Sequence, residues 1–360
     1  MKRIGISTGG GDAPGLNAVI RAVTLASIRR GWEVFGLLRG YGAFFDPSQV
    51  RVLDRDAVRG TTHLGGTILG TRSGANPFER RVEQEDGSVV VEDLTEEAIA
   101  GFHRLGLDAL VAVGGDGSMR LALKLHKLGV PVVGVPKTID NDLAGTNVTF
   151  GFHTAVDVAT AAIERLHSTA EAHDRIFVVE LMGRYAGWIA LFAGVAATAQ
   201  VILIPEIPYD MDEVCDHLMA RERRGRHFAV VVAAEGARPV GGDFTWSKGV
   251  GGGPVERLGG VAERVAAEIH ERTGKETRTV TLGHLQRGGQ PIPYDRLIAL
   301  RFGAAAVRQI EEGKFGVMVA LDPPTVRAVP LERAVSRMKS VPLEADVVAT
   351  ARDLGICLGE

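Results

Sequence analysis

RIGISTGGGDAPGLNAVIRAV, residues 3–23, decides the fold class of this chain. Its apolar run Arg3–Ser7 predicts a strand, Thr8–Gly15 a glycine loop, and Leu16–Arg30 an amphipathic helix that ends before Gly31. The same succession of a short apolar run, a turn and a helical pattern recurs along the whole chain. Such alternation is typical of parallel sheets covered by helices on both faces. The sequence therefore predicts an α/β protein.

The composition excludes several classes of protein. With 45% hydrophobic and 24% charged residues, the chain has the balance of a soluble globular protein, and neither disorder nor a fibrous repeat fits it. Its 41 basic and 44 acidic residues give a net charge of -3, so no general attraction to nucleic acid or to an anionic membrane is expected. Cys215 and Cys357 lie far apart without metal-binding spacing, which favours a cytoplasmic protein.

The length of 360 residues predicts two α/β domains or one large one. We expect two domains, at residues 1–145 and 146–300, with residues 301–360 returning toward the first domain. Residues 236–260 are rich in glycine and weakly patterned, which indicates a surface excursion. Residues 185–205 carry no charge and are interpreted as a buried helix followed by a buried strand at Val201–Ile204, with a membrane span as the alternative.

Two helix starts are predicted from capping residues. Thr95, followed by two glutamates, is expected to cap a helix that ends near Gly106. Ser118 is expected to cap a helix that runs to Leu128.

Three loops follow predicted strands of the first domain: Gly9–Gly15 (GGGDAPG), Gly114–Ser118 (GGDGS) and Lys137–Asp142 (KTIDND). The carboxyl ends of parallel strands form the ligand crevice of an open sheet, so these loops are expected to converge. Glycines there expose backbone N–H groups to phosphate, and Asp116 can hold Mg²⁺. A tight turn explains any one of these loops alone, but three together favour a phosphate site.

Two common nucleotide motifs are absent from the sequence. The first loop is not a G-x-G-x-x-G, because Pro14 occupies its last position, and no G-x-x-x-x-G-K-[ST] follows the first strand. A nicotinamide dehydrogenase and a P-loop enzyme are therefore disfavoured, and the Gly-Gly-Asp-Gly turn favours phosphoryl transfer.

Asp140 and Asp142 are two residues apart and would face the same side of an extended segment. Phosphoryl transfer needs one carboxylate that orders Mg²⁺ and one that accepts the proton of the attacking hydroxyl. An acidic turn with solvated side chains is the alternative, which the neighbouring Lys137, Thr138 and Asn141 make less attractive.

Cations gather at predicted strand ends in the second half of the chain. A phosphorylated sugar needs several forked donors, and the candidates are Arg175, Arg184, Arg278, His284 and Arg287. Glu235 closes a strand and could accept hydrogen bonds from sugar hydroxyls. Each of these residues taken singly is equally consistent with an ordinary surface position.

The sequence resembles the phosphofructokinases from Gly5 to about Arg301. The motifs that carry the resemblance are GGDAPGLN at 10–17, GGDGS at 114–118, PKTIDND at 136–142, MGR at 182–184 and GHLQRGG at 283–289. The resemblance implies two Rossmann-like three-layer α/β/α domains with the active site in the cleft between them. The first domain would bind the phosphoryl donor with Mg²⁺, and the second would bind fructose 6-phosphate.

The resemblance also implies roles for individual residues. Asp140 is similar to the general base for the sugar 1-hydroxyl, with Lys137 and Thr138 beside it, and Asp116 to the Mg²⁺ carboxylate. The implied donor contacts are Gly11, Arg72, Gly115, Asp116, Gly117 and Ser118. The implied sugar phosphate contacts are Thr138, Asp140, Asp142, Met182, Gly183, Arg184, Glu235, His284 and Arg287. Arg175 and Arg278 resemble residues supplied by a neighbouring subunit, which implies a homodimer or a homotetramer.

The resemblance leaves two donors open. Family members that use pyrophosphate carry Asp where this chain has Gly117, so Gly117 favours ATP. Lys137, however, is typical of the pyrophosphate group. ATP is the expected donor and pyrophosphate the alternative. A non-catalytic sugar phosphate sensor on the same fold is disfavoured, because Asp116, Asp140 and Asp142 are all present.

Overall fold

The computed structural model describes residues 1–71, 76, 78–84, 86–247 and 257–360. The chain forms two compact units. Unit 1 consists of Met1–Thr138, Leu143–Gly151 and Arg287–Met338, and unit 2 of Ile139–Asp142, Phe152–Gln286 and Lys339–Glu360. The expected division differs from this one in four places. Residues 146–151 and 287–300 belong to unit 1, whereas residues 139–142 and those after Met338 belong to unit 2.

Unit 1 is built on a seven-stranded sheet with the order β15-β14-β7-β6-β1-β2-β3. Strands β1, β2, β6, β7 and β14 run parallel, and the edge strands β3 and β15 are antiparallel to their neighbours. The bounds are β1 Arg3–Thr8, β2 Glu33–Leu37, β3 Val50–Val52, β6 Ala109–Gly114, β7 Val132–Pro136, β14 Val317–Asp322 and β15 Thr325–Pro330. Since β2 and β6 lie on opposite sides of β1, the sheet has its topological switch point there, where ligand crevices form.

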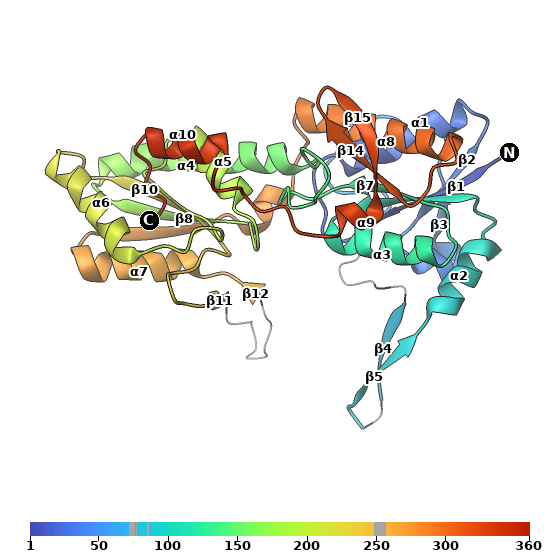
Figure 1. Cartoon of the computed structure of the whole chain (residues 1–360), viewed down its shortest axis with the longest axis horizontal. Helices are drawn as coiled ribbons and strands as arrows, with labels where there is room; N and C mark the ends of the chain where they lie inside the picture. Colours follow the sequence, from blue (N-terminus) through green and yellow to red (C-terminus); the bar gives the residue numbers. More distant parts are fainter. Residues whose placement is uncertain (72–75, 77, 85, 248–256) are drawn as a thin grey trace. The chain divides into compact units, whose positions relative to one another are not determined.

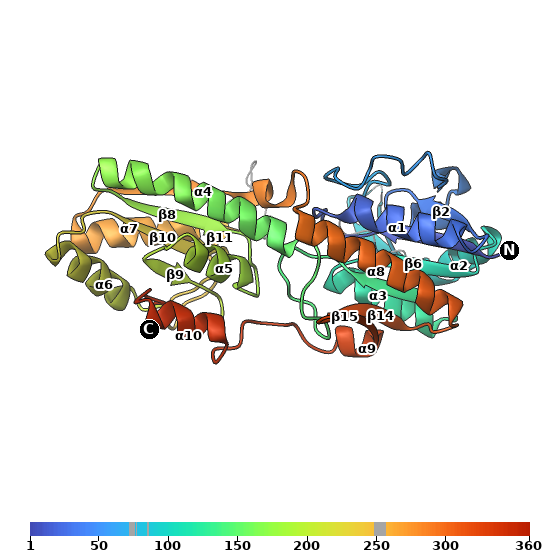
Figure 2. The same ribbon diagram turned by 90° about the horizontal axis from the view of Figure 1, so that it is seen from above.

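Helices cover both faces of this sheet (Figure 1). Helices α1 (Leu16–Ile28) and α8 (Pro293–Glu311) pack side by side on one face, as Figure 2 shows from above. On the other face lie α2 (Thr95–Arg104), α3 (Asp116–Lys127) and α9 (Leu331–Ala334). A cluster of buried side chains that includes Phe44, Phe102 and Leu110 fills the space under these helices, so the sheet is buried on both sides.

Unit 2 contains a four-stranded parallel sheet with the order β13-β8-β10-β9. The bounds are β8 Ile176–Leu181, β9 Val201–Leu203, β10 Ala229–Ala234 and β13 Thr277–Thr281. One face is covered by α4 (Phe152–Ala172) and α5 (Trp188–Ala196), and the other by α6 (Met211–Arg223) and α7 (Val261–Thr273), while α10 (Asp346–Asp353) packs on α5. The central strands β8 and β10 are almost wholly buried, and their Val-rich sequences fit that position.

The uncharged segment 185–205 folds as α5 followed by β9, so its interpretation as a buried helix and a buried strand is confirmed. No helix among the described residues is sufficiently long and apolar to span a bilayer. Within the glycine-rich stretch 236–260, a short antiparallel pair, β11 (Trp246–Ser247) with β12 (Arg257–Leu258), flanks residues 248–256, which lie outside the described residues.

Both predicted helix caps are wrong. Helix α2 has Leu94 at its N-cap, and the Asp93 carboxylate accepts a hydrogen bond of 2.9 Å from the Thr95 amide. Helix α3 begins at Asp116 with Gly115 as N-cap, so Ser118 already belongs to the first turn. The hairpins β14–β15 and β4 (Glu79–Glu83) with β5 (Val89–Asp93) were not expected from the sequence.

Candidate active site

The loops that follow β1 and β6 in unit 1 are in direct contact. The Gly9 amide donates a hydrogen bond of 2.9 Å to the Val113 carbonyl. A Cβ atom at Gly9 would lie 2.7 Å from Ser118 Oγ, and one at Gly114 would lie 2.2 Å from the same hydroxyl. A side chain at Gly9 would make the Ser118 hydroxyl move, whereas one at Gly114 would collide with Ser118 Cβ as well, also at 2.2 Å. Glycine at 114 is therefore required by the tight turn between β6 and α3.

Lys137, directly after β7, joins these two loops to a third. Its side chain is only 3% exposed, and its Nζ donates a hydrogen bond to the Gly11 carbonyl. The Lys137 amide donates to the Gly114 carbonyl at 2.9 Å. The predicted convergence is thus confirmed for the loops at Gly9–Gly15, Gly114–Ser118 and Lys137. The rest of the third loop, Ile139–Asp142, belongs to unit 2.

Arg287 was expected among the sugar phosphate contacts, and within unit 1 it lies against the first glycine loop. Its Nη1 donates to the Asp12 carbonyl at 3.3 Å and would be 3.0 Å from a Cβ atom at Gly11. His284 belongs to unit 2, so the boundary between the units divides the motif GHLQRGG. Thr138 is buried in unit 1, where its carbonyl accepts a hydrogen bond of 2.7 Å from Thr149 Oγ1.

Asp116 and Gly117 open helix α3 directly after Gly115. The Asp116 carboxylate forms an ion pair of 2.9 Å with Arg120 one turn later, and this hydrogen bond raises the pKa of Arg120. An acidic side chain in the first turn favours the helix. Among the described residues, no atom lies within 4 Å of a Cβ atom built at Gly117.

Asp116 is chemically suited to Mg²⁺. This cation is usually held in phosphoryl-transfer sites by one or two carboxylates together with the phosphates of the substrate. The carboxylate is partly exposed at a strand end beside the glycine loops, and its partner Arg120 is itself exposed and could release it. Among the described residues, no three His, Cys, Asp or Glu side chains are grouped as a metal site.

In unit 2, the loops after β8 and β10 meet at the carboxyl edge of the sheet. The Gly236 amide donates to the Gly183 carbonyl at 3.1 Å, and the Glu235 amide donates to the Leu181 carbonyl at 2.8 Å. Gly183 has a φ of 144°, which glycine adopts easily. Met182, Arg184 and Glu235 are therefore neighbours in space. The Arg184 guanidinium lies 4.9 Å from the centre of the Tyr185 ring.

The next strand brings a further candidate to the same edge. The Leu282 amide donates to the Glu180 carbonyl at 3.1 Å, and exposed His284 follows two residues later in the helical turn Gly283–Arg287. Glu180 itself is buried, which raises the pKa of its carboxyl, and it accepts a hydrogen bond of 3.0 Å from the Ala262 amide at the start of α7.

Arg175 and Arg278 lie at the opposite edge of this sheet. Arg175 immediately precedes β8, and Arg278 pairs in register with Phe177 near the start of the same strand. Both guanidinium groups form ion pairs with Glu276, and the Arg175 hydrogen bond lowers the pKa of that carboxyl. At about 3.3 Å per residue, the length of β8 puts these arginines roughly 20 Å from Met182 and Arg184 of the same chain.

Sequence reasoning missed Lys339, whose side chain reaches the loop that carries Asp140 and Asp142. Lys339 Nζ donates to Asn141 Oδ1 at 3.1 Å, and the Lys339 amide donates to the Asp142 carbonyl at 2.8 Å. No motif marks this lysine, because it lies 198 residues from Asn141 in the chain. Arg120 was also missed as the ion-pair partner of Asp116. The sequence does contain a signal for it, since a spacing of four residues is that of one helical turn.

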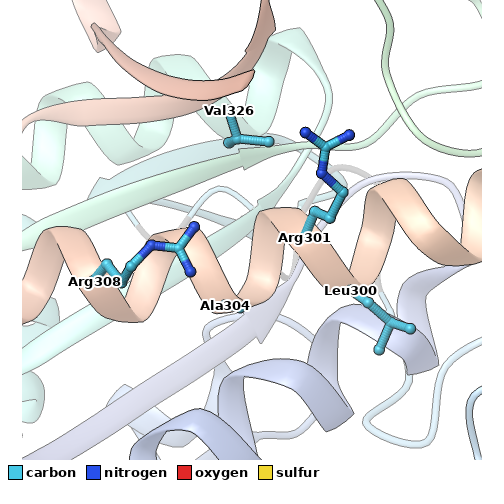
Figure 3. A pocket seen from close by; sticks show the side chains of 5 residues that line it. All are labelled: Leu300, Arg301, Ala304, Arg308 and Val326. Atoms are coloured by element: carbon cyan, nitrogen blue, oxygen red, sulfur yellow. The ribbon is translucent and has the colours of Figure 1, made fainter. Parts of the chain in front are cut away.

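Arg72, an expected contact of the donor, lies outside the described residues. A separate pocket of about 300 Å³ in unit 1 lies between α8 and β15 and includes none of the predicted site residues. Arg301 and Arg308 extend from α8 on the side of Val326 there (Figure 3).

The sequence matches the phosphofructokinase family over residues 3–310. It is 48% identical over 360 residues to the ATP-dependent 6-phosphofructokinase of Chloroflexus aurantiacus, covering 100% of this chain and 98% of the relative. Its identity to ATP-dependent 6-phosphofructokinase 2 of Clostridium perfringens is 46% over 363 residues, covering 100% of this chain and 99% of that one. Pichia pastoris phosphofructokinase in the T-state superimposes with a TM-score of 0.80 at 30% identity, covering 98% of this chain and 37% of the longer yeast chain. The chain belongs to the phosphofructokinase family.

Proposed function

We propose that this protein transfers the terminal phosphoryl group of Mg-ATP to the 1-hydroxyl of fructose 6-phosphate, as a cytoplasmic enzyme. The observation that carries the proposal is the junction of the two glycine loops with Lys137 at the switch point of the unit 1 sheet. Two relatives that match over the whole chain, at 46% and 48% identity, are named ATP-dependent 6-phosphofructokinase, which supports it.

The donor side of the proposed reaction relies on the backbone. The glycines present their N–H groups and the start of α3 to the phosphates, and Lys137 adds a fixed positive charge beside Gly11. Asp116 would hold the Mg²⁺, which when bound neutralises charge that develops on the transferred group. Since no described atom lies within 4 Å of a Cβ atom at Gly117, the backbone of this residue can approach a donor phosphate closely.

The acceptor side relies on side chains. Asp140 takes the proton of the attacking hydroxyl, with Thr138 and Asp142 beside it in sequence, and general-base assistance of this kind is worth about 10²- to 10⁴-fold. Met182, Gly183, Arg184, Glu235 and His284 orient the sugar phosphate from the carboxyl edge of the unit 2 sheet.

Arg175 and Arg278 are proposed to reach the sugar phosphate of a neighbouring subunit in a homodimer or homotetramer. Their position at the amino edge of the unit 2 sheet supports this, since a single extended side chain does not span the roughly 20 Å to the other edge. The ion pairs with Glu276 hold both guanidinium groups close to each other, so that both can contact the same phosphate group.

A coupled assay on the purified protein tests the proposal. Fructose 6-phosphate is supplied with Mg-ATP in one series and with Mg-pyrophosphate in another, and formation of fructose 1,6-bisphosphate is measured. The expected result is turnover with ATP. Pyrophosphate is the second candidate, which Lys137 favours, and faster turnover with it would replace ATP as the donor. Binding of the sugar phosphate without product from either donor would instead indicate a sensor.

A further inference from the structure

Lys339 is the first residue of unit 2 after the chain leaves unit 1 for the last time. Its backbone is fixed on both sides, because its amide donates to the Asp142 carbonyl at 2.8 Å and its carbonyl accepts a bond of 3.0 Å from Trp188 Nε1. Trp188 is itself buried at the start of α5. The segment 139–142 is thereby attached to a rigid element of its own unit.

The Lys339 side chain adds a second attachment. Its Nζ lies 5.4 Å from the centre of the Trp188 ring and donates to Asn141 Oδ1 at 3.1 Å. Burial lowers the pKa of Lys339 to about 8, while the negative charge of Asp142 acts in the opposite direction. An ammonium group brought into this setting loses hydration, so its contacts with Asn141 and Asp142 must compensate for that loss.

Asn141 needs such support because of its backbone. It is buried and has a φ of 51°, in the left-handed region that residues other than glycine adopt only at a cost. The backbone conformation of Asn141 also sets the relative directions of Asp140 and Asp142, which precede and follow it in the chain. A hydrogen bond to the side-chain oxygen of Asn141 therefore restrains both residues that carry carboxylates.

We propose that Lys339 is a positioning residue for phosphoryl transfer: through Asn141 Oδ1 it holds the loop 139–142 in the conformation that the base Asp140 requires. This inference rests on the proposed function of Asp140. Lys339 makes no contact with the reacting groups in the proposal, and its effect on the reaction passes through Asn141.

The test compares Lys339→Met, which keeps the length of the side chain and removes the donor, with Lys339→Arg, which keeps charge and donors. Small displacements of a catalytic group can cost about 10²-fold in rate, so Lys339→Met is expected to lower kcat by about 10- to 100-fold. The KM for ATP should change less than about threefold, because the donor loops belong to unit 1. Lys339→Arg should recover part of kcat. Lys314→Met, which removes an exposed lysine paired with Glu312, is the matched control and should behave as the wild type.

A double-mutant cycle separates positioning from general destabilisation. Asn141→Gly removes the acceptor and tolerates the positive φ, so Lys339→Met in that background should have little further effect on kcat. Independent, multiplying effects would overturn the proposal, as would an unchanged kcat in Lys339→Met.

Hydrogen exchange of a peptide covering residues 139–142 supplies a measurement that does not depend on activity. Exchange in this peptide should be faster in Lys339→Met than in the wild type and in Lys314→Met. Unchanged exchange would overturn the proposal even if kcat fell. If the wild type gives no product with ATP or pyrophosphate, the proposed function fails, and the exchange result still decides whether Lys339 holds this loop.

Discussion

The carboxyl edges of the two sheets are prepared for ligands in different ways. In unit 1 the loops after β1 and β6 touch, because the Gly9 amide donates to the Val113 carbonyl at 2.9 Å and a Cβ atom at Gly9 would lie 2.7 Å from Ser118 Oγ. In unit 2 the loops after β8 and β10 also touch, through Gly183 and Gly236, but they present Met182, Arg184 and Glu235. The edge in unit 1 presents mainly backbone, with Lys137 buried behind it, whereas the edge in unit 2 presents side chains.

This difference matches the chemistry that each unit is proposed to serve. A polyphosphate chain is uniform and flexible, so backbone N–H groups and the N-terminus of a helix can bind it without contacts from long side chains. A sugar phosphate has hydroxyls at fixed positions, and forked or charged side chains are needed to recognise them. Substitutions in unit 1 should therefore act by steric and charge conflict with the donor, and those in unit 2 by loss of contacts to the acceptor.

The largest expected effect is at Asp140, the proposed proton acceptor. Asp140→Asn preserves shape but cannot take the proton, so kcat should fall by about 10²- to 10⁴-fold, while binding of fructose 6-phosphate changes little. Initial rates at saturating donor, together with a direct binding measurement, check this. Retained turnover would remove Asp140 from its assigned role.

Gly117→Asp tests the donor side. The side chain enters open space, so the fold should be kept, but a carboxylate beside the ATP phosphates should reduce kcat/KM for ATP by about a hundredfold, or roughly 2.7 kcal/mol. Pyrophosphate, which has no α-phosphate, should suffer less. Gly117→Ala is the matched control without charge. Equal losses in both variants would show that bulk, and not charge, decides the donor.

Arg278→Ala tests the acceptor side and the proposed subunit exchange. Loss of a charge-assisted hydrogen bond should raise the KM for fructose 6-phosphate about tenfold, with little change in stability because Arg278 is half exposed. Mixing this variant with Asp140→Asn should restore activity to about a quarter of the wild type at low sugar concentration, since half of the dimers are hybrids with one intact site each. If subunits exchange and activity does not return, each chain completes its own site.

The smallest expected effect concerns stability and pH. The pKa of Lys339 is about 8 in the folded protein and 10.5 in its ordinary state, so the unfolded chain binds more protons between these values. The free energy of unfolding of the wild type, relative to Lys339→Met, should therefore rise with pH from about 8 upward, by on the order of 1–2 kcal/mol near pH 9.5. Urea titrations of both proteins at pH 7.5 and 9.5 measure it. A difference that does not vary with pH would mean that the lysine is well hydrated in the folded state.

Much of the fold follows from local patterns. The first strand, the helix that follows it and the helix and strand within the uncharged segment 185–205 lie close to their expected bounds, because the periodicity of apolar residues is a local property. The two helix caps failed for local reasons. The Asp93 carboxylate, two residues before Thr95, accepts the hydrogen bond from the Thr95 amide, and α3 begins at Asp116, so that Ser118 lies within its first turn.

The sequence by itself determined the α/β class and the presence of three loops suited to phosphate at strand ends. The tertiary structure decided how these residues are shared between the units: Arg287 packs on the Gly11 loop, and Arg175 with Arg278 occupies the amino edge of the unit 2 sheet. It also brought Lys339 to Asn141 across 198 residues. Such contacts depend on the order of the strands in each sheet and on the fact that the chain crosses between the two units several times. No local pattern of polar and apolar residues encodes either property.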